Sequence, residues 1–91
     1  MKILKQTSQF KKDLKKIQNN PKKIASLEIV LKLLAETGTL PSKYKPHLLK
    51  GNYKGYLEAH IDGDFLLIWI DEIEDVIKLT RLGSHSELFK E

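Results

Sequence analysis

The sequence predicts an α+β domain: an N-terminal strand and an α-helical hairpin packed on one face of a mainly antiparallel four- to five-stranded sheet, with a short C-terminal helix. Residues 8–37 repeat apolar side chains at helical spacing, whereas residues 56–82 contain the alternation and short apolar runs of strands. Residues 1–91 are expected to form one domain, because a chain of 91 residues supports a single hydrophobic core.

Residues 2–6 are expected to form the first strand, which ends at the polar pair Thr7 and Ser8. Either hydroxyl can cap the helix that follows by accepting a hydrogen bond from its first turn. This helix has an apolar stripe opposite a row of lysines. The stripe consists of Phe10, Leu14 and Ile17.

A second helix is predicted to begin at Asn20 and Pro21, since Asn is a common N-cap and Pro suits the first helical position. It should end near Gly38, whose freedom at positive φ suits a helix C-terminus. Its apolar residues are Ile24, Leu27, Val30, Leu31, Leu33 and Leu34. The two helices therefore form a hairpin with one apolar side.

Residues 37–54 contain two prolines and two glycines, and are expected to form a long connection with one short strand at 47–50. Strands are expected at residues 56–61, 65–70 and 76–82. The middle strand is apolar along its length, so it is expected to lie inside the sheet. Residues 71–75 form an acidic turn. Gly83 and Ser84 then open a short helical turn that holds His85, Leu88 and Phe89.

The strand at 56–61 alternates, with Tyr56, Glu58 and His60 on the face away from the helices. That face is expected to stay open, where it could support an extended ligand such as single-stranded RNA or a protein segment. A hairpin turn is predicted at residues 62–63. A two-residue turn would place Asp64 on the face opposite His60, whereas a three-residue loop would relax this constraint.

Charge is distributed unevenly along the chain. The net charge is +4, but residues 1–54 carry 13 lysines and three acids, or +10, and residues 55–91 carry three basic residues and nine acids, or −6. Such asymmetry favours a polyanionic partner for the lysine-rich part, with well-solvated helices as the alternative. The absence of cysteine excludes disulfides and thiolate zinc sites. With no apolar run typical of a signal peptide or membrane helix, the protein is expected to be cytoplasmic.

Three histidines, His47, His60 and His85, occur in the second half of the chain. Imidazole transfers protons near neutral pH, so together they suggest acid–base chemistry, although each could also be an ordinary surface residue. Arg81, the only arginine, can bind phosphate in a bidentate way or form a salt bridge with a nearby acid. The stretch from His60 to Asp64 offers possible metal ligands but lacks the spacing of a zinc site, so neither metal nor cofactor is expected.

Two segments carry a family resemblance. Residues 44–69, YKPHLLKGNYKGYLEAHIDGDFLLIW, and residues 81–89, RLGSHSELF, resemble the YafQ-like branch of the RelE/ParE toxin superfamily of bacterial toxin–antitoxin systems. The elements H-x-L-x-G, K-G-Y-x-x-A-H and R-x-G-x-H-x-x-L-F carry this likeness. It implies a RelE-like fold and an mRNA interferase, an endoribonuclease that cleaves messenger RNA, often on the ribosome, and that a cognate antitoxin neutralises.

The resemblance also implies a set of site residues. The catalytic and positioning residues would be His47, His60, Asp64 and His85. Arg81 and Phe89 would bind the substrate. Independently of the resemblance, Glu58 and Lys54 are also expected to be substrate-binding residues. Metal-independent RNA cleavage needs a base for the 2′-OH, an acid for the leaving 5′-oxygen and a cation for the phosphoryl oxygens. His60 and His85 are expected to be base and acid, in either order, while Phe89 stacks on a nucleobase.

Two other functions remain open at this stage. The lysines and the sheet face would also suit a non-catalytic module that binds nucleic acid or protein. ParE-like relatives share the fold and inhibit gyrase, but they lack this set of histidines, which favours RNA cleavage.

Overall fold

The computed structural model describes residues 1–71 and 75–89, in which one five-stranded sheet carries two long helices on one face. The predicted acidic turn at 71–75 lies mostly outside the described residues. The elements are β1 (Ile3–Gln6), α1 (Ser8–Lys16), α2 (Pro21–Thr37), η1 (Ser42–Tyr44), β2 (His47–Leu48), η2 (Gly51–Tyr53), β3 (Leu57–Asp62), β4 (Phe65–Asp71), β5 (Val76–Gly83) and α3 (His85–Leu88). Both η elements are short 3-10 helices.

The strands are ordered β1-β5-β4-β3-β2, so the apolar strand β4 is central, as the sequence predicts. Three of the four pairings are antiparallel, and β1 runs parallel to β5. The sheet is therefore mixed, which agrees with the expectation of a mainly antiparallel sheet. Because β1 pairs only with residues 76–79, the last part of β5 has no neighbouring strand on that side within residues 1–71 and 75–89.

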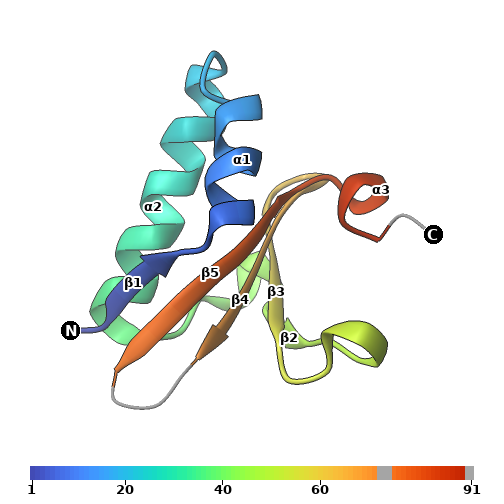
Figure 1. Cartoon of the computed structure of the whole chain (residues 1–91). Helices are drawn as coiled ribbons and strands as arrows, with labels where there is room; N and C mark the ends of the chain where they lie inside the picture. Colours follow the sequence, from blue (N-terminus) through green and yellow to red (C-terminus); the bar gives the residue numbers. More distant parts are fainter. Residues whose placement is uncertain (72–74, 90–91) are drawn as a thin grey trace.

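Local signals determine both long helices. Thr7 rather than Ser8 caps α1, since its hydroxyl oxygen accepts a hydrogen bond from the Phe10 N–H at 3.1 Å. Asn20 caps α2 in the same way, and Gly38 ends that helix with φ at 77°. Figure 1 shows the two helices side by side over the sheet.

The main hydrophobic core lies between this hairpin and the sheet. Phe10 of α1 and Val30 and Leu34 of α2 pack against the helix-facing side chains of β4 and β5 and are fully buried. Removal of this apolar surface from water is the main term that stabilises the fold. The apolar residues of α1 and α2 that the sequence predicts to face the core do lie in this cluster.

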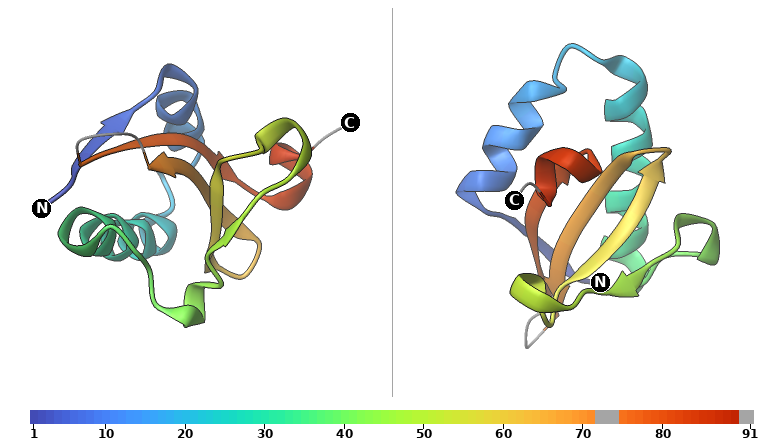
Figure 2. Two further views of the ribbon diagram at one scale, coloured as in Figure 1. Left: turned by 90° about the horizontal axis from the view of Figure 1, so that it is seen from below. Right: turned by 90° about the vertical axis from the view of Figure 1, so that its right-hand side faces the viewer.

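The other face of the sheet is not open, contrary to expectation. Leu66 and Ile68 of β4 project from it and are completely buried, and Leu88 of α3 packs on them. Tyrosine rings of the β2–β3 connection flank this second cluster. The physical reason is that β4 is apolar at every position from 65 to 70, so both of its faces must be covered. Figure 2 shows α3 beside the connection that contains η2.

The hairpin between β3 and β4 also differs from the predicted one. Asp62 pairs with Phe65, so Gly63 and Asp64 form the turn, with Gly63 at φ 58°. Between His60 and Asp62 the register shifts by one residue, which identifies a β-bulge. Simple alternation does not anticipate a bulge. Among the described helices, none combines the length and apolarity required to cross a bilayer.

Candidate active site

The three histidines converge on the second face of the sheet. The ring centroid of His60 lies 6.4 Å from that of His47 and 6.4 Å from that of His85. Each side chain remains open to solvent, with exposed fractions of 48%, 33% and 60% for His47, His60 and His85. A substrate can therefore reach imidazoles from three elements at one place.

His47 is positioned by the two-residue strand β2, which pairs it with Glu58 of β3. Its Nδ1 lies 2.8 Å from the Lys45 carbonyl oxygen, which only accepts, so Nδ1 carries the proton. Lys45 has a left-handed backbone, with φ 51°, that turns this carbonyl toward the ring. The Nε2 atom of His47 then faces Glu58.

Glu58 lies between His47 and His60. Its Oε1 is 3.3 Å from Nε2 of His47 and 3.9 Å from Nε2 of His60. The side chain is only 3% exposed, and its Oε2 has no hydrogen-bond partner among the described residues. The sequence predicts substrate binding for Glu58, whereas in the structure its carboxylate faces the imidazoles rather than solvent.

His85 is held at the start of α3. Ser84 and Glu87 form a reciprocal capping box, in which the hydrogen bond from the Ser84 N–H is the main cause of a lowered pKa for Glu87. Asp64 accepts the backbone N–H of His85 at 3.0 Å, and the same oxygen is 3.8 Å from Nδ1 of its ring. The turn at Gly63 and Asp64 thus brings Asp64 to the same side as the histidines. A two-residue turn at 62–63 would have placed it on the opposite face.

Aromatic rings continue from the histidines along the same surface. The Phe89 ring lies 5.1 Å from His85 and 5.7 Å from Tyr53, between centroids. Tyr53 in turn makes an edge contact with Tyr56. Phe89 is partly exposed, so a nucleobase could stack on it.

Arg81 forms the salt bridge that the sequence left as an alternative. Its Nε donates to Asp13 Oδ2 at 2.8 Å, and the side chain is 21% exposed. Hydrogen bonding to Asp13 raises the pKa of Arg81 above its ordinary value, against the effect of burial, and Tyr53 adds to the increase. Lys54 is exposed after η2, and no hydrogen bond or ion pair joins it to the histidines in the described part of the chain.

Asp13 of α1 is a residue that the sequence analysis missed. Its buried carboxylate also accepts the N–H of Leu82 at 3.0 Å, at the end of β5 that lacks a neighbouring strand. Burial raises the pKa of Asp13, but hydrogen bonds from Arg81, Leu82 and Gln9 outweigh it, so the pKa lies below its ordinary value. The sequence feature that could have indicated Asp13 is that it is the single acid among the lysines of α1. Within the described residues, no group of three or more His and acidic side chains is arranged to hold a metal ion.

A helical hairpin behind a mixed sheet, with clustered histidines and aromatic rings in front, defines a RelE-like toxin domain. The chain belongs to the YafQ family, since the family model described as "Bacterial toxin of type II toxin-antitoxin system, YafQ" matches residues 2–90. A curated relative, the mRNA interferase toxin YafQ of Escherichia coli K12, is 36% identical over 84 residues, which are 91% of this chain and 90% of the relative.

Solved structures support the same assignment. The E. coli DinJ–YafQ complex contains a chain with a TM-score of 0.84 and 32% identity, with 98% of this chain and 99% of that chain covered. A metal-bound toxin from Helicobacter pylori has a TM-score of 0.86 and 40% identity, with 98% and 100% covered. The expected RelE-like fold is therefore confirmed.

Proposed function

We propose that this toxin is an mRNA interferase, an endoribonuclease that cleaves messenger RNA by metal-independent attack of the 2′-OH on the adjacent phosphate and so inhibits translation. The name of the E. coli relative supports the reaction class. The observation that carries the mechanism is the series of three solvent-accessible imidazoles with neighbouring centroids 6.4 Å apart. Residues 1–91 act as one toxin domain.

His60 and His85 are the base and the acid, in an order that the geometry leaves open. Their rings are close enough for one phosphodiester to lie between them, with hydrogen bonds of about 2.8 Å to the oxygen atoms that gain and lose protons. One ring takes the proton of the 2′-OH as the new P–O bond forms. The other protonates the 5′-oxygen as its bond to phosphorus breaks.

The remaining residues position these groups or bind the RNA. Asp64 orients His85 by accepting a hydrogen bond from the backbone N–H of His85. His47 lies on the other side of His60. Arg81, braced by Asp13, is the cation for the phosphoryl oxygens, and Phe89 stacks on a neighbouring base. Lys54 adds charge attraction for the RNA backbone. Glu58 acts through the histidines that it contacts.

The partners of the chain follow from its family. A cognate antitoxin neutralises it, as the complex of E. coli YafQ with DinJ supports. An mRNA substrate, often on the ribosome, supports a location in the cytoplasm. An antitoxin with acidic segments would complement the lysine-rich half, which carries a net charge of +10.

The test is cleavage of purified RNA in the presence of a chelator. His60→Ala and His85→Ala should each lower the cleavage rate about 10²- to 10⁴-fold while the fold is retained. Lys32→Gln, an exposed change on α2, should cleave like the wild type. Binding of RNA without any cleavage would favour a non-catalytic module, and DNA damage in cells without RNA loss would favour gyrase inhibition. A requirement for added metal would contradict the proposed mechanism.

A further inference from the structure

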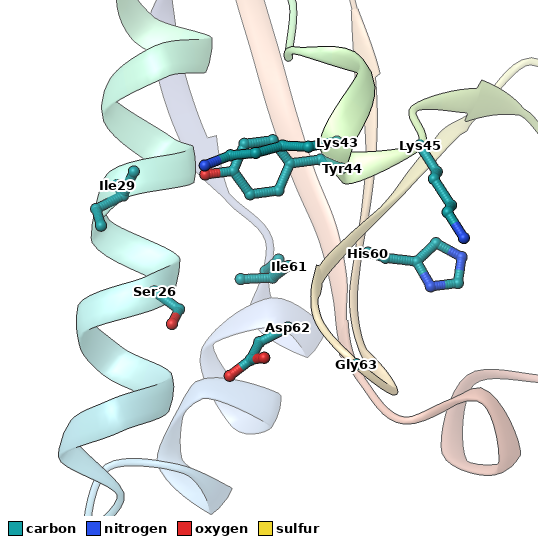
Figure 3. A pocket seen from close by; sticks show the side chains of 9 residues that line it. All are labelled: Ser26, Ile29, Lys43, Tyr44, Lys45, His60, Ile61, Asp62 and Gly63. Carbon is teal, nitrogen blue, oxygen red and sulfur yellow. The ribbon is translucent and has the colours of Figure 1, made fainter.

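A pocket beside His60 has no role in the mechanism above. It has a volume of about 510 Å³ and lies between α2, the segment that contains η1, and the turn that joins β3 to β4. Figure 3 shows Ser26 and Ile29 of α2 on one side of the pocket and His60 on the other, with the His60 ring directed away from α2 toward Lys45. This volume is within the range of about 300–1,000 Å³ that is typical of small-molecule sites.

The pocket exists because β2 is very short. It pairs only with Leu57 and Glu58, so the remainder of β3 has no neighbouring strand on that side among the described residues. A chain bound at the histidines can cross this edge and continue toward α2. His60 belongs both to the histidine cluster and to the pocket wall, so the two sites are continuous.

The walls provide positive charge where such a chain would enter. Lys43 lies over the ring of Tyr44, with its Nζ 5.1 Å from the ring centroid. Lys45 extends beside the His60 ring (Figure 3). Both lysines are exposed, and within the described residues neither has a carboxylate partner. In Figure 3 the Lys45 ammonium lies beside His60, where it suits the next phosphate of the strand, whereas the Lys43 ammonium points toward α2.

The α2 wall differs in chemistry. Ile29 of α2 is 56% exposed although it is a large apolar residue, and it offers an apolar surface for a base. Ser26 and Asp62 project from opposite sides (Figure 3), and the Asp62 carboxylate has no hydrogen-bond or ion-pair partner in the described part of the chain. A base would thus find an apolar surface and an unpaired acceptor together.

We propose that this pocket is a nucleotide subsite that binds the residue next to the scissile phosphate and selects a base with an exocyclic amino group. This inference rests on the proposed RNA cleavage and adds a selectivity to it. Lys45 binds the flanking phosphate beside His60, and Lys43 adds positive charge on the α2 side. The base lies against Ile29, and Asp62 accepts the amino hydrogen. An ionised carboxylate only accepts hydrogen bonds, so it pairs with amino groups. Uracil is disfavoured because its single N–H lies between two carbonyl oxygens that repel the carboxylate.

The first experiment measures single-turnover cleavage of short RNAs that differ only in the nucleotide on either side of the cut. The wild type should cleave RNAs with an amino-bearing base at one of these positions about 10-fold faster than those with uracil. Asp62→Asn should reduce this ratio to near one, because an amide both donates and accepts. Unchanged selectivity in Asp62→Asn, or no selectivity in the wild type, would overturn the proposal.

The second experiment measures binding of an uncleavable 2′-O-methyl RNA by fluorescence anisotropy at several salt concentrations. Lys45→Asn, which tolerates the left-handed backbone, and Lys43→Gln should each weaken binding about fivefold and reduce the salt slope by about one. Lys32→Gln, an equal change of charge on α2 outside the pocket, is the matched control. Wild-type affinity and slope in both pocket variants would refute the subsite.

The two proposals can fail separately. If amino-base preference and the lysine effects appear in binding although no RNA is cut, the subsite stands and the cleavage mechanism fails. If RNA is cut in a histidine-dependent way by all pocket variants with wild-type selectivity, the subsite fails alone. Loss of antitoxin binding in the pocket variants, with RNA binding unchanged, would assign the pocket to the protein partner and reject the subsite.

Discussion

Glu58 is a charged residue in a place that normally disfavours charge. The carbonyl of Lys45 fixes the proton of His47 on Nδ1, so its Nε2 faces the Glu58 carboxylate at 3.3 Å. A carboxylate oxygen only accepts hydrogen bonds, so Glu58 presents an acceptor to His47. His60 approaches the same oxygen atom at 3.9 Å. Burial of the carboxylate makes this interaction stronger than it would be in water.

Glu58→Gln keeps the shape of the side chain and removes its charge. We expect kcat to fall about 10-fold and its pH profile to change, because the negative charge beside His47 and His60 is lost. KM should stay within about twofold, since a side chain that is 3% exposed makes little contact with substrate. Steady-state kinetics between pH 5 and 9 measure both. A raised KM with unchanged kcat would instead support the direct substrate contact that the sequence suggests.

At the scale of elements, Asp13 joins α1 to the unpaired end of β5. Its carboxylate accepts the Leu82 N–H, as a neighbouring strand would, and it also holds Arg81. The side chain is 1% exposed, so replacing one carboxylate oxygen by an amide NH2 sets a donor against donors in a dry environment and weakens the hydrogen bonds that remain. The helix thereby both completes the sheet edge and fixes the arginine assigned to phosphate binding.

Asp13→Asn should lower the free energy of unfolding at pH 7 by about 3 kcal/mol. Because the pKa of Asp13 is lowered from its ordinary value of 3.8, its contribution to stability is complete above that value. It is lost as the pH falls further, through the pKa of the folded state. Urea unfolding from pH 7 to pH 2.5 should therefore show the wild type and variant converging in acid. A constant difference across this range would contradict the assignment.

How far the sequence predicts each element depends on how local its determinants are. Both helices, with caps at Asn20 and Gly38, follow from neighbouring residues, as does the central position of β4. The turn at Gly63 depends on a bulge, and the cover of the second face depends on α3, both of which are tertiary effects. Imidazole chemistry and the family resemblance both indicated the histidines. Their common partner Glu58 and the pairing of Arg81 with Asp13 instead depend on strand register.

At the scale of the molecule, the two faces of the sheet have different tasks. The face under α1 and α2 contains most of the buried apolar side chains and stabilises the fold. The other face carries the histidines on β2, β3 and α3, three elements that are short or lie at an edge. Rigid strands thus position groups that come from loops and ends, an arrangement typical of catalytic sites. The lysine-rich half adds attraction for a polyanion.

The most direct test of the mechanism uses an RNA with a single 2′-deoxynucleotide on the 5′ side of the cleavage site, in the presence of a chelator. If the histidines activate the 2′-OH, cleavage at that site should stop, while the unmodified RNA should yield a fragment that ends in a 2′,3′-cyclic phosphate. Mass spectrometry of the fragments measures both outcomes. Cleavage at the deoxy position at the wild-type rate would contradict the account.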